Sequence, residues 1–254
     1  MSELRWNPVL QEWVITATHR QDRTFFPPPE YCPLCPTKPG AFPTEIPMED
    51  YDIVVFENKF PSLRSIAPDP AVTGTELSPI DRAEGVCEVV CYTSDHNTEL
   101  AKLPLKKIHN LVRVWVDRFE DLGSRDYVDY VFIFENKGKE IGVTLSHPHG
   151  QIYAYPYLPP RTTKMLEVAS AHKNRTGRVL MDDIVVREMK DQVRIISQNE
   201  EWVAYVPYAS RYPFEIHLAP KKPVPDLAAL SDYACDAFPS IAKEILLRLD
   251  ASLI

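Results

Sequence analysis

The stretch between Pro27 and Pro43 restricts the fold of this chain more than any other, because it holds seven of the chain's 24 prolines. Proline has no backbone N–H and a fixed φ angle, so such a stretch can be neither a helix nor a central strand. It needs another means of being held in place. We therefore expect residues 1–50 to form an N-terminal hairpin, with a turn at Asn7-Pro8, and then a proline-rich arm that binds a metal ion.

The candidate metal ligands begin with a Cys-x-x-Cys motif inside this arm, formed by Cys32 and Cys35. The motif occurs in redox proteins and in zinc sites, and the redox interpretation is weak here because no strand–helix junction follows it. Structural zinc sites commonly use two cysteines and two histidines. His96 and His147 complete such a set and would fix the arm to a sheet. The spacing is not that of a compact zinc finger, so zinc at these four residues is a hypothesis.

The composition is that of an ordinary globular chain and disfavours several classes of protein. Of the 254 residues, 44% are hydrophobic and 25% are charged. The net charge of −8 and the pI of about 5.4 argue against nucleic acid as a partner. No run approaches the roughly 20 apolar residues of a membrane span, and the first residues lack the apolar core of a signal peptide. We therefore expect no membrane partner and a cytoplasmic location. Five cysteines without a secretory signal argue against a disulfide framework.

The hydrophobic periodicity alternates between that of strands and that of helices, which predicts an α+β fold. The clearest helix covers residues 104–122, where apolar residues recur at intervals of three and four and Gly123 follows as a C-terminal cap. Further helices are expected at residues 162–173 and 178–190. Strands are expected at residues 52–57, 86–93, 127–135, 192–198 and 201–206.

Two stretches of the chain share one pattern, which predicts an internal repeat. In each copy a strand with an aromatic turn leads to a second strand, at residues 88–92 and 215–219, and then to an apolar-periodic helix. The first copy continues into further strands, whereas the second reaches residue 254 before them. The expected division is residues 51–160 for the first repeat, 161–200 for connecting helices and a strand, and 201–254 for the start of an incomplete second repeat.

The pentapeptide at residues 147–151, His-Pro-His-Gly-Gln, is the main candidate for a reaction centre. Burying its polar side chains unpaired would cost on the order of 1–3 kcal/mol each, while the apolar flanks favour a strand. In a strand, imidazoles two residues apart share a face. One can bind metal while the other, neutral near pH 7, acts as a nucleophile. Nearby glycines let backbone N–H groups approach an anion, which indicates attack on phosphorus. The competing interpretation is a pair of surface histidines.

These residues resemble the signature of the galactose-1-phosphate uridylyltransferase family, a branch of the histidine-triad superfamily. The central match runs from Phe134-Glu135-Asn136-Lys137-Gly138 through the pentapeptide to Ile152. Further matches follow the family order over nearly the whole chain: Asn7-Pro8, His19-Arg20 with Arg23, Cys32-Pro33-Leu34-Cys35, Val55-Phe56-Glu57-Asn58, Asp95-His96 and Tyr212-Pro213-Phe214-Glu215. The resemblance implies a histidine-triad-like α+β fold of two related half-repeats, with an antiparallel sheet, packed helices and an incomplete second repeat.

The resemblance also implies a ping-pong transfer of UMP between UDP-glucose and galactose 1-phosphate. His149 would attack the α-phosphorus and carry UMP as a phosphoramidate, while the His147 carbonyl fixes its tautomer. Gln151 stands where hydrolytic relatives carry a third histidine. A glutamine can hydrogen-bond phosphoryl oxygens but cannot protonate the leaving group, which favours transfer over hydrolysis. The residues implied for holding the uridylyl group are Arg20, Arg23, Asn58, Asn136 and Thr144. The residues that match the family's zinc ligands are Cys32, Cys35, His96 and His147.

Assembly and function leave alternatives open. Family members usually continue into a segment with sugar-phosphate contacts, so we expect this chain to lack that C-terminal segment. Family enzymes are dimers with a shared active site, which predicts a homodimer or a complex with a separately encoded C-terminal piece. Two other functions remain possible: a related nucleotidyl phosphorylase, for example one acting on an ADP-sugar, and a non-catalytic zinc-stabilised nucleotide-binding protein.

Overall fold

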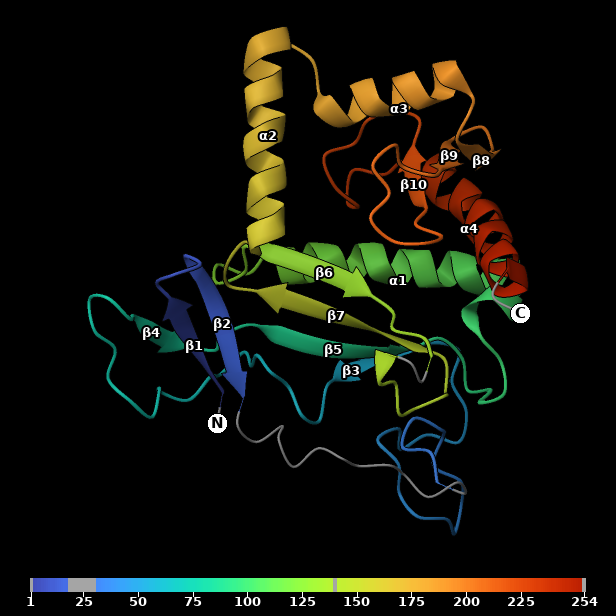
Figure 1. Ribbon diagram of the computed structural model, residues 1–254. Coiled ribbons are helices and arrows are strands. Elements are labelled where there is room, and N and C mark those ends of the chain that lie inside the picture. Colours follow the sequence, from blue (N-terminus) through green and yellow to red (C-terminus); the bar gives the residue numbers. More distant parts are fainter. Residues whose placement is uncertain (1, 18–30, 139–140, 253–254) are drawn as a thin grey trace. The chain divides into compact units, whose positions relative to one another are not determined.

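The computed structural model describes residues 2–17, 31–138 and 141–252. The chain divides into two compact units, which we treat one at a time (Figure 1). Unit one comprises residues 1–98 and 119–160, and unit two comprises residues 99–118 and 161–254. The predicted four-part division at residues 50, 160 and 200 follows a different criterion, sequence repeats, and stays a prediction.

Unit one is built on a four-stranded antiparallel sheet. Its strands are β3 (Val54–Glu57), β5 (Val86–Cys91), β6 (Tyr130–Phe134) and β7 (His149–Tyr155), in the order β3-β5-β7-β6. All six residues of β5 are buried, five of them valines and cysteines that suit a central strand and the sixth the charged Glu88. Antiparallel register places Cys91 opposite His149 and Val89 opposite Gln151. This pairing fixes which β7 side chains share a face.

A second, smaller sheet in unit one contains the predicted N-terminal hairpin. Strands β1 (Ser2–Asn7) and β2 (Glu12–Ala17) pair with one another, and β4 (Ile80–Arg82) pairs with β1. The turn is closed by the Asn7 side chain, whose Oδ1 accepts hydrogen bonds from the backbone N–H groups of Val9 and Leu10. The prediction of a hairpin with its turn at Asn7-Pro8 is confirmed.

Unit two combines helices with a three-stranded antiparallel sheet. Its elements are η2 (Leu100–Lys102), most of α1 (Leu105–Gly123), α2 (Pro160–Thr176), α3 (Leu180–Asp191), β8 (Ile195–Gln198), β9 (Trp202–Tyr205), β10 (His217–Pro220) and α4 (Asp232–Ser252). The sheet order is β10-β9-β8. One core cluster joins Trp202 and Ala204 of β9 to Ile241 and Ile245 of α4. No helix in the described ranges is long and apolar enough to cross a membrane.

Most predicted elements are present, and the α+β fold class is confirmed. The segment β9-β10-α4 has the same strand, antiparallel strand, helix order as β3-β5-α1, the order on which the predicted repeat rests. The apolar-periodic run of the second copy, Phe238 to Leu249, covers only part of α4, which begins at Asp232 and contains Pro239. A proline inside a helix removes one backbone hydrogen bond, because it has no N–H. Pro239 nevertheless lies inside α4, where its side chain is buried.

A correction concerns the histidine pentapeptide. The prediction placed His147 and His149 in one strand on one face, but β7 begins at His149. The intervening Pro148 has no N–H to continue the ladder, and its carbonyl instead accepts the N–H of Tyr92 at 3.2 Å. The two imidazoles are therefore free to serve different sites.

Trp202 provides a test of the unit-two core. Its indole Nε1 donates a hydrogen bond of 2.7 Å to the Ala234 carbonyl, and its ring packs edge-on against Phe238 at 5.1 Å. Trp202→Phe removes the donor and part of the buried ring, so we expect it to lower the free energy of unfolding by about 1–3 kcal/mol. Tyr233→Phe, at a position that is 79% exposed on α4, is the control and should change it little. Denaturant unfolding measures both, and equal stability of the two variants would contradict this account.

Candidate active site and metal centre

His149 is held in one tautomer by its own chain. Its Nδ1 lies 2.7 Å from the carbonyl oxygen of His147, so Nδ1 carries the hydrogen and donates it. The lone pair of the ring is then on Nε2. Burial lowers the pKa of the His149 imidazole, and the hydrogen bond to the carbonyl only partly offsets this, so the ring is neutral near pH 7. A neutral, oriented imidazole with one free lone pair is the form in which histidine acts as a nucleophile.

The strand next to His149 needs a glycine. A Cβ built on Gly150 would lie 2.2 Å from the Tyr92 hydroxyl oxygen and 3.0 Å from the Phe134 carbonyl oxygen. Because residues alternate along a strand, Gly150 faces the buried side while His149 and Gln151 face the opposite side. The glycine therefore lets the strand lie close to Tyr92.

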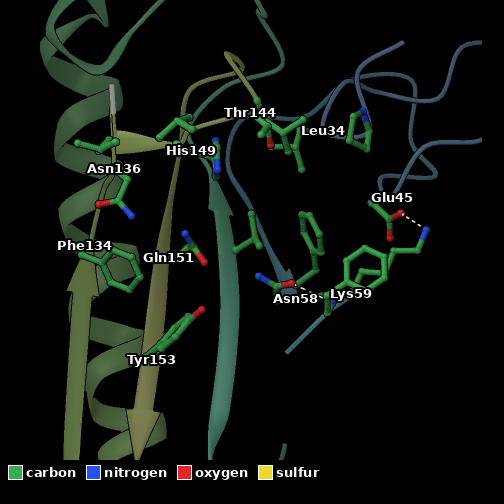
Figure 2. A pocket seen from close by; sticks show the side chains of 18 of the residues that line it. Leu34, Glu45, Asn58, Lys59, Phe134, Asn136, Thr144, His149, Gln151 and Tyr153 are labelled. Carbon is green, nitrogen blue, oxygen red and sulfur yellow. Dashed lines mark hydrogen bonds and ion pairs between the residues drawn. The ribbon is translucent and has the colours of Figure 1, made fainter. Parts of the chain in front are cut away.

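His149 and Gln151 face a cavity of about 790 Å³ in unit one, which also receives Asn58, Asn136 and Thr144 (Figure 2). Three amide side chains, a hydroxyl and an imidazole thus lie around one space large enough for a nucleotide sugar. Five of the predicted catalytic and uridylyl-binding residues are brought together here. The other two, Arg20 and Arg23, lie outside the described residues.

Two of the charged side chains lining this cavity pair with one another. Lys59 Nζ lies 2.7 Å from Glu45 Oε1, joining the segment after β3 to the proline-rich arm. Beside them, Asn58 is buried and its Oδ1 accepts the backbone N–H of Phe60 at 2.9 Å. That hydrogen bond fixes the orientation of the amide, so its NH₂ group is the part available to a ligand.

Apolar side chains line the rest of the cavity, and the sequence analysis did not select them. Phe134 and Tyr153 pack edge-on at 5.2 Å, and Leu34, Phe56, Phe60 and Val89 contribute further apolar surface. Tyr153 could have been found, because it is four residues after His149 and strand alternation puts both on one face. The others come from separate segments, and no local pattern marks them.

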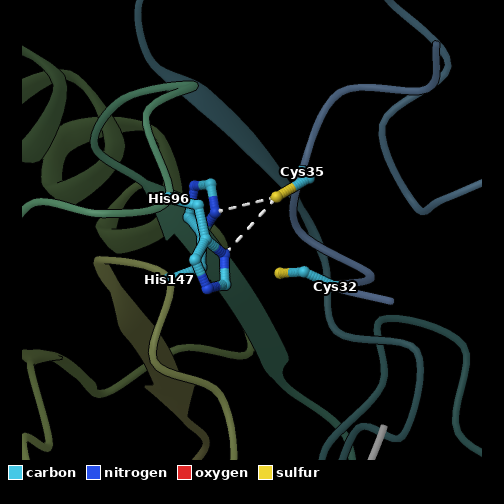
Figure 3. A group of neighbouring side chains, drawn as sticks. All are labelled: Cys32, Cys35, His96 and His147. Carbon is cyan, nitrogen blue, oxygen red and sulfur yellow. Dashed lines mark hydrogen bonds between the residues drawn. The ribbon is translucent and has the colours of Figure 1, made fainter. Parts of the chain in front are cut away.

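The predicted metal ligands Cys32, Cys35, His96 and His147 converge on one point of unit one (Figure 3). Their ligand atoms all lie within 4.8 Å of one another, and Cys35 Sγ lies 3.5 Å from Nδ1 of both histidines. Sulfur and nitrogen on one tetrahedral zinc ion would be about 3.6 Å apart, given Zn–S near 2.3 Å and Zn–N near 2.0–2.1 Å. The cluster could therefore hold a metal ion, and its donor set and spacing fit zinc.

Hydrogen bonds hold the His147 ring at Nε2, the nitrogen that points away from the cysteines. His147 is 1% exposed, and its Nε2 lies 2.8 Å from the Thr93 carbonyl and 2.8 Å from the Tyr51 hydroxyl oxygen. Tyr51 in turn donates to the carbonyl of Leu34, between the two cysteines, at 2.9 Å. Such outer contacts orient metal-binding imidazoles. The sequence analysis missed Tyr51 and Thr93, because neither belongs to a ligand motif.

The thiol of Cys35 needs a nearby cation to ionise at neutral pH. Burial, and then the neighbouring Cys32, raise the pKa of Cys35 to about 12, so without a cation this thiol is protonated at neutral pH. A bound divalent ion stabilises the thiolate and displaces the proton. The histidines present Nδ1 to the centre while Nε2 of His96 lies 3.2 Å from Ser146 Oγ. This arrangement is complete as a four-ligand metal site.

Comparison with known proteins identifies one protein family along nearly the whole chain. The model of the galactose-1-phosphate uridyl transferase N-terminal domain matches residues 1–159, and that of the C-terminal domain matches residues 165–253. Galactose-1-phosphate uridylyltransferases of Streptomyces lividans and Thermotoga maritima are each 42% identical over 98% of this chain. The chain spans 65% of the length of the first relative and 76% of the second.

Solved structures support the fold. A structure described as uridylyltransferase matches 95% of this chain and 73% of its own, with a TM-score of 0.83 and 30% identity. An ADP-glucose phosphorylase from Arabidopsis thaliana with bound ADP-glucose matches 97% of this chain and 76% of its own, with a TM-score of 0.69 and 24% identity, and is similar in fold. The antiparallel sheets and helices of this chain form the same class of α+β fold as these structures. This chain belongs to the galactose-1-phosphate uridylyltransferase family.

The four-residue cluster predicts that each chain binds one metal ion. We expect one divalent ion per chain by elemental analysis, and Cys35→Ser should lose most of it because serine is a poor ligand for a soft metal site. Cys235→Ser is the matched control, since Cys235 is also a free cysteine but lies in unit two. Full metal content in the Cys35→Ser protein would contradict the four-ligand assignment.

Proposed function

We propose that this chain transfers UMP between UDP-glucose and galactose 1-phosphate through a uridylyl-histidine intermediate on His149. The observation that carries the proposal is the hydrogen bond of 2.7 Å from His149 Nδ1 to the His147 carbonyl, beside a cavity lined by amides. It leaves Nε2 as the nucleophilic atom. Membership of the family and the named relatives support the choice of substrates.

In the first half-reaction, Nε2 of His149 forms a bond to the α-phosphorus of UDP-glucose, and the bond from that phosphorus to the bridging oxygen breaks. The electron pair leaves with glucose 1-phosphate. His149 becomes positively charged as it forms the phosphoramidate, and the carbonyl of His147 stabilises the hydrogen that stays on Nδ1. In the second half-reaction, a phosphate oxygen of galactose 1-phosphate attacks the same phosphorus and releases His149.

The neutral side chains around the cavity suit the developing charge on phosphorus. The amides of Asn58, Asn136 and Gln151 and the hydroxyl of Thr144 can each donate to a phosphoryl or ribose oxygen. Gln151 has no acidic proton for the leaving group, which favours a second phosphate over water as acceptor. Arg20 and Arg23 are proposed to contact the uridylyl group on the basis of the family resemblance alone.

Zinc is the proposed metal, held by Cys32, Cys35, His96 and His147. When bound, it supplies structural charge that keeps the thiolates ionised and the arm attached to the sheet. His147 then contributes its ring to the metal and its carbonyl to His149. Loss of the metal should therefore lower the free energy of unfolding and leave the position of His149 less well fixed.

The covalent step predicts a specific label. Incubation with UDP-glucose labelled in the uridine should leave one acid-labile, base-stable label on His149. His149→Gly should abolish transfer, and imidazole with a UMP-imidazole donor should restore part of it. His109→Gly, on the surface of α1, is the matched control and should retain the label. A label on another residue, or normal turnover without His149, would refute the mechanism.

Donor selectivity separates the proposed function from its alternatives. We expect His149 to be labelled from UDP-glucose at least tenfold faster than from ADP-glucose in single-turnover experiments, a difference of about 1.4 kcal/mol. A preference for ADP-glucose with phosphate as acceptor would favour a phosphorylase instead. Binding of UDP-glucose without any label would favour a non-catalytic nucleotide-binding protein.

We also propose a homodimer, on the basis of the family resemblance. Light scattering on the purified protein measures its mass in solution. Separate assays of the two half-reactions then show whether this chain alone passes UMP to galactose 1-phosphate. A stable monomer with full acceptor turnover would contradict the proposal of a shared site.

A further inference from the structure

A buried tyrosine connects the segment directly before β7, which begins with His149, to the segment after β6, which contains Asn136. Tyr92 directly follows β5, is 1% exposed, and donates a hydrogen bond of 3.1 Å from its hydroxyl to Glu135 Oε2. Its backbone N–H donates to the Pro148 carbonyl at 3.2 Å. One residue therefore contacts both the segment before His149 and the segment before Asn136.

The Tyr92 hydroxyl lies at the back of the cavity wall. It occupies the space that a Cβ on Gly150 would need, only 2.2 Å from the ideal Cβ position. Gly150 stands between His149 and Gln151, and Glu135 stands directly before Asn136. The side chains of His149, Gln151 and Asn136 face the same cavity (Figure 2). A shift of the Tyr92 hydroxyl would thus move the His149–Gln151 side of the cavity relative to the side that carries Asn136.

We propose that Tyr92 is a positioning residue, whose hydroxyl sets the spacing between the His149–Gln151 wall and Asn136 for the transfer reaction. The proposal rests on the function proposed above. Tyr92 itself touches no substrate, because its hydroxyl lies on the buried side of β7. Burial, and then the charge of Glu135, raise the pKa of the Tyr92 phenol well above its usual range, so the hydroxyl stays a donor at any working pH.

Tyr92→Phe tests the proposal, because it deletes the hydroxyl and keeps the ring. We expect formation of the uridylyl-histidine in a single turnover to slow about tenfold, the effect of losing one hydrogen bond to a charged acceptor. Amide hydrogen exchange should speed up in residues 134–138 and 149–151 and nowhere else. Metal content should stay near that of the wild type, and the unfolding midpoint should fall only by the amount expected for the loss of one hydrogen bond.

Tyr205→Phe is the matched control. Tyr205 is also 1% exposed, its hydroxyl has no hydrogen-bond partner among the described residues, and it lies in unit two. Its loss should leave the rate and the local exchange unchanged. A Tyr92→Phe protein with a rate within twofold of wild type and unchanged exchange at both segments would overturn the proposal.

Glu135 gives a second arm in case Tyr92→Phe does not fold. Glu135→Gln keeps an acceptor for the hydroxyl and should stay near wild type, whereas Glu135→Ala should reproduce the slower rate and the local exchange. Equal rates in these two variants would overturn the proposal. If the wild type itself acquires no label on His149, the proposed function fails, while the hydrogen-exchange comparison still tests the positioning by Tyr92.

Discussion

The functional half of this molecule depends on His147, which is used twice. Its ring is buried among the metal ligands, with Nδ1 toward Cys35 and Nε2 held by the Thr93 carbonyl. Its backbone carbonyl fixes the tautomer of His149 at a distance of 2.7 Å. Anything that moves this four-residue cluster therefore also moves the imidazole of His149, the proposed nucleophile. Pro148 makes this double use possible by ending the strand between the two histidines.

The elements of the fold were largely predictable, because their hydrophobic periodicities are strong. The helix predicted at residues 104–122 is observed as Leu105–Gly123, and the strands predicted at residues 52–57, 86–93, 127–135, 192–198 and 201–206 are each present in shortened form. Prolines stand at the two places that differ most. Pro148 separates His147 from β7, as its missing N–H explains, whereas Pro239 is accommodated inside α4.

The residues of the candidate site that belong to short sequence motifs could be predicted, whereas those that reach the site through packing could not. The pentapeptide at residues 147–151 and the Cys-x-x-Cys motif led to the cavity and to the four-ligand cluster. Tyr51 and Tyr92 were missed, because their roles depend on contacts between segments 40 or more residues apart, as between Tyr92 and Glu135 (43 positions) or Tyr51 and His147 (96 positions). Phe134 lies in a matched motif, but its place in the cavity lining comes from the fold. The strand order β3-β5-β7-β6 brings these segments together, and the sequence does not state that order.

The metal cluster has a consequence for the order in which the chain is made. Cys35 lies 61 positions before His96 and 112 positions before His147. On a growing chain, the two thiols emerge long before their imidazole partners, and closing loops of that length costs entropy that only a formed sheet can repay. During this interval the cysteine pair is an open chelate, and soft ions such as Cu(I) bind thiolates more tightly than zinc does. The thiol pair is thus present before the four-ligand arrangement that could discriminate between metal ions has formed.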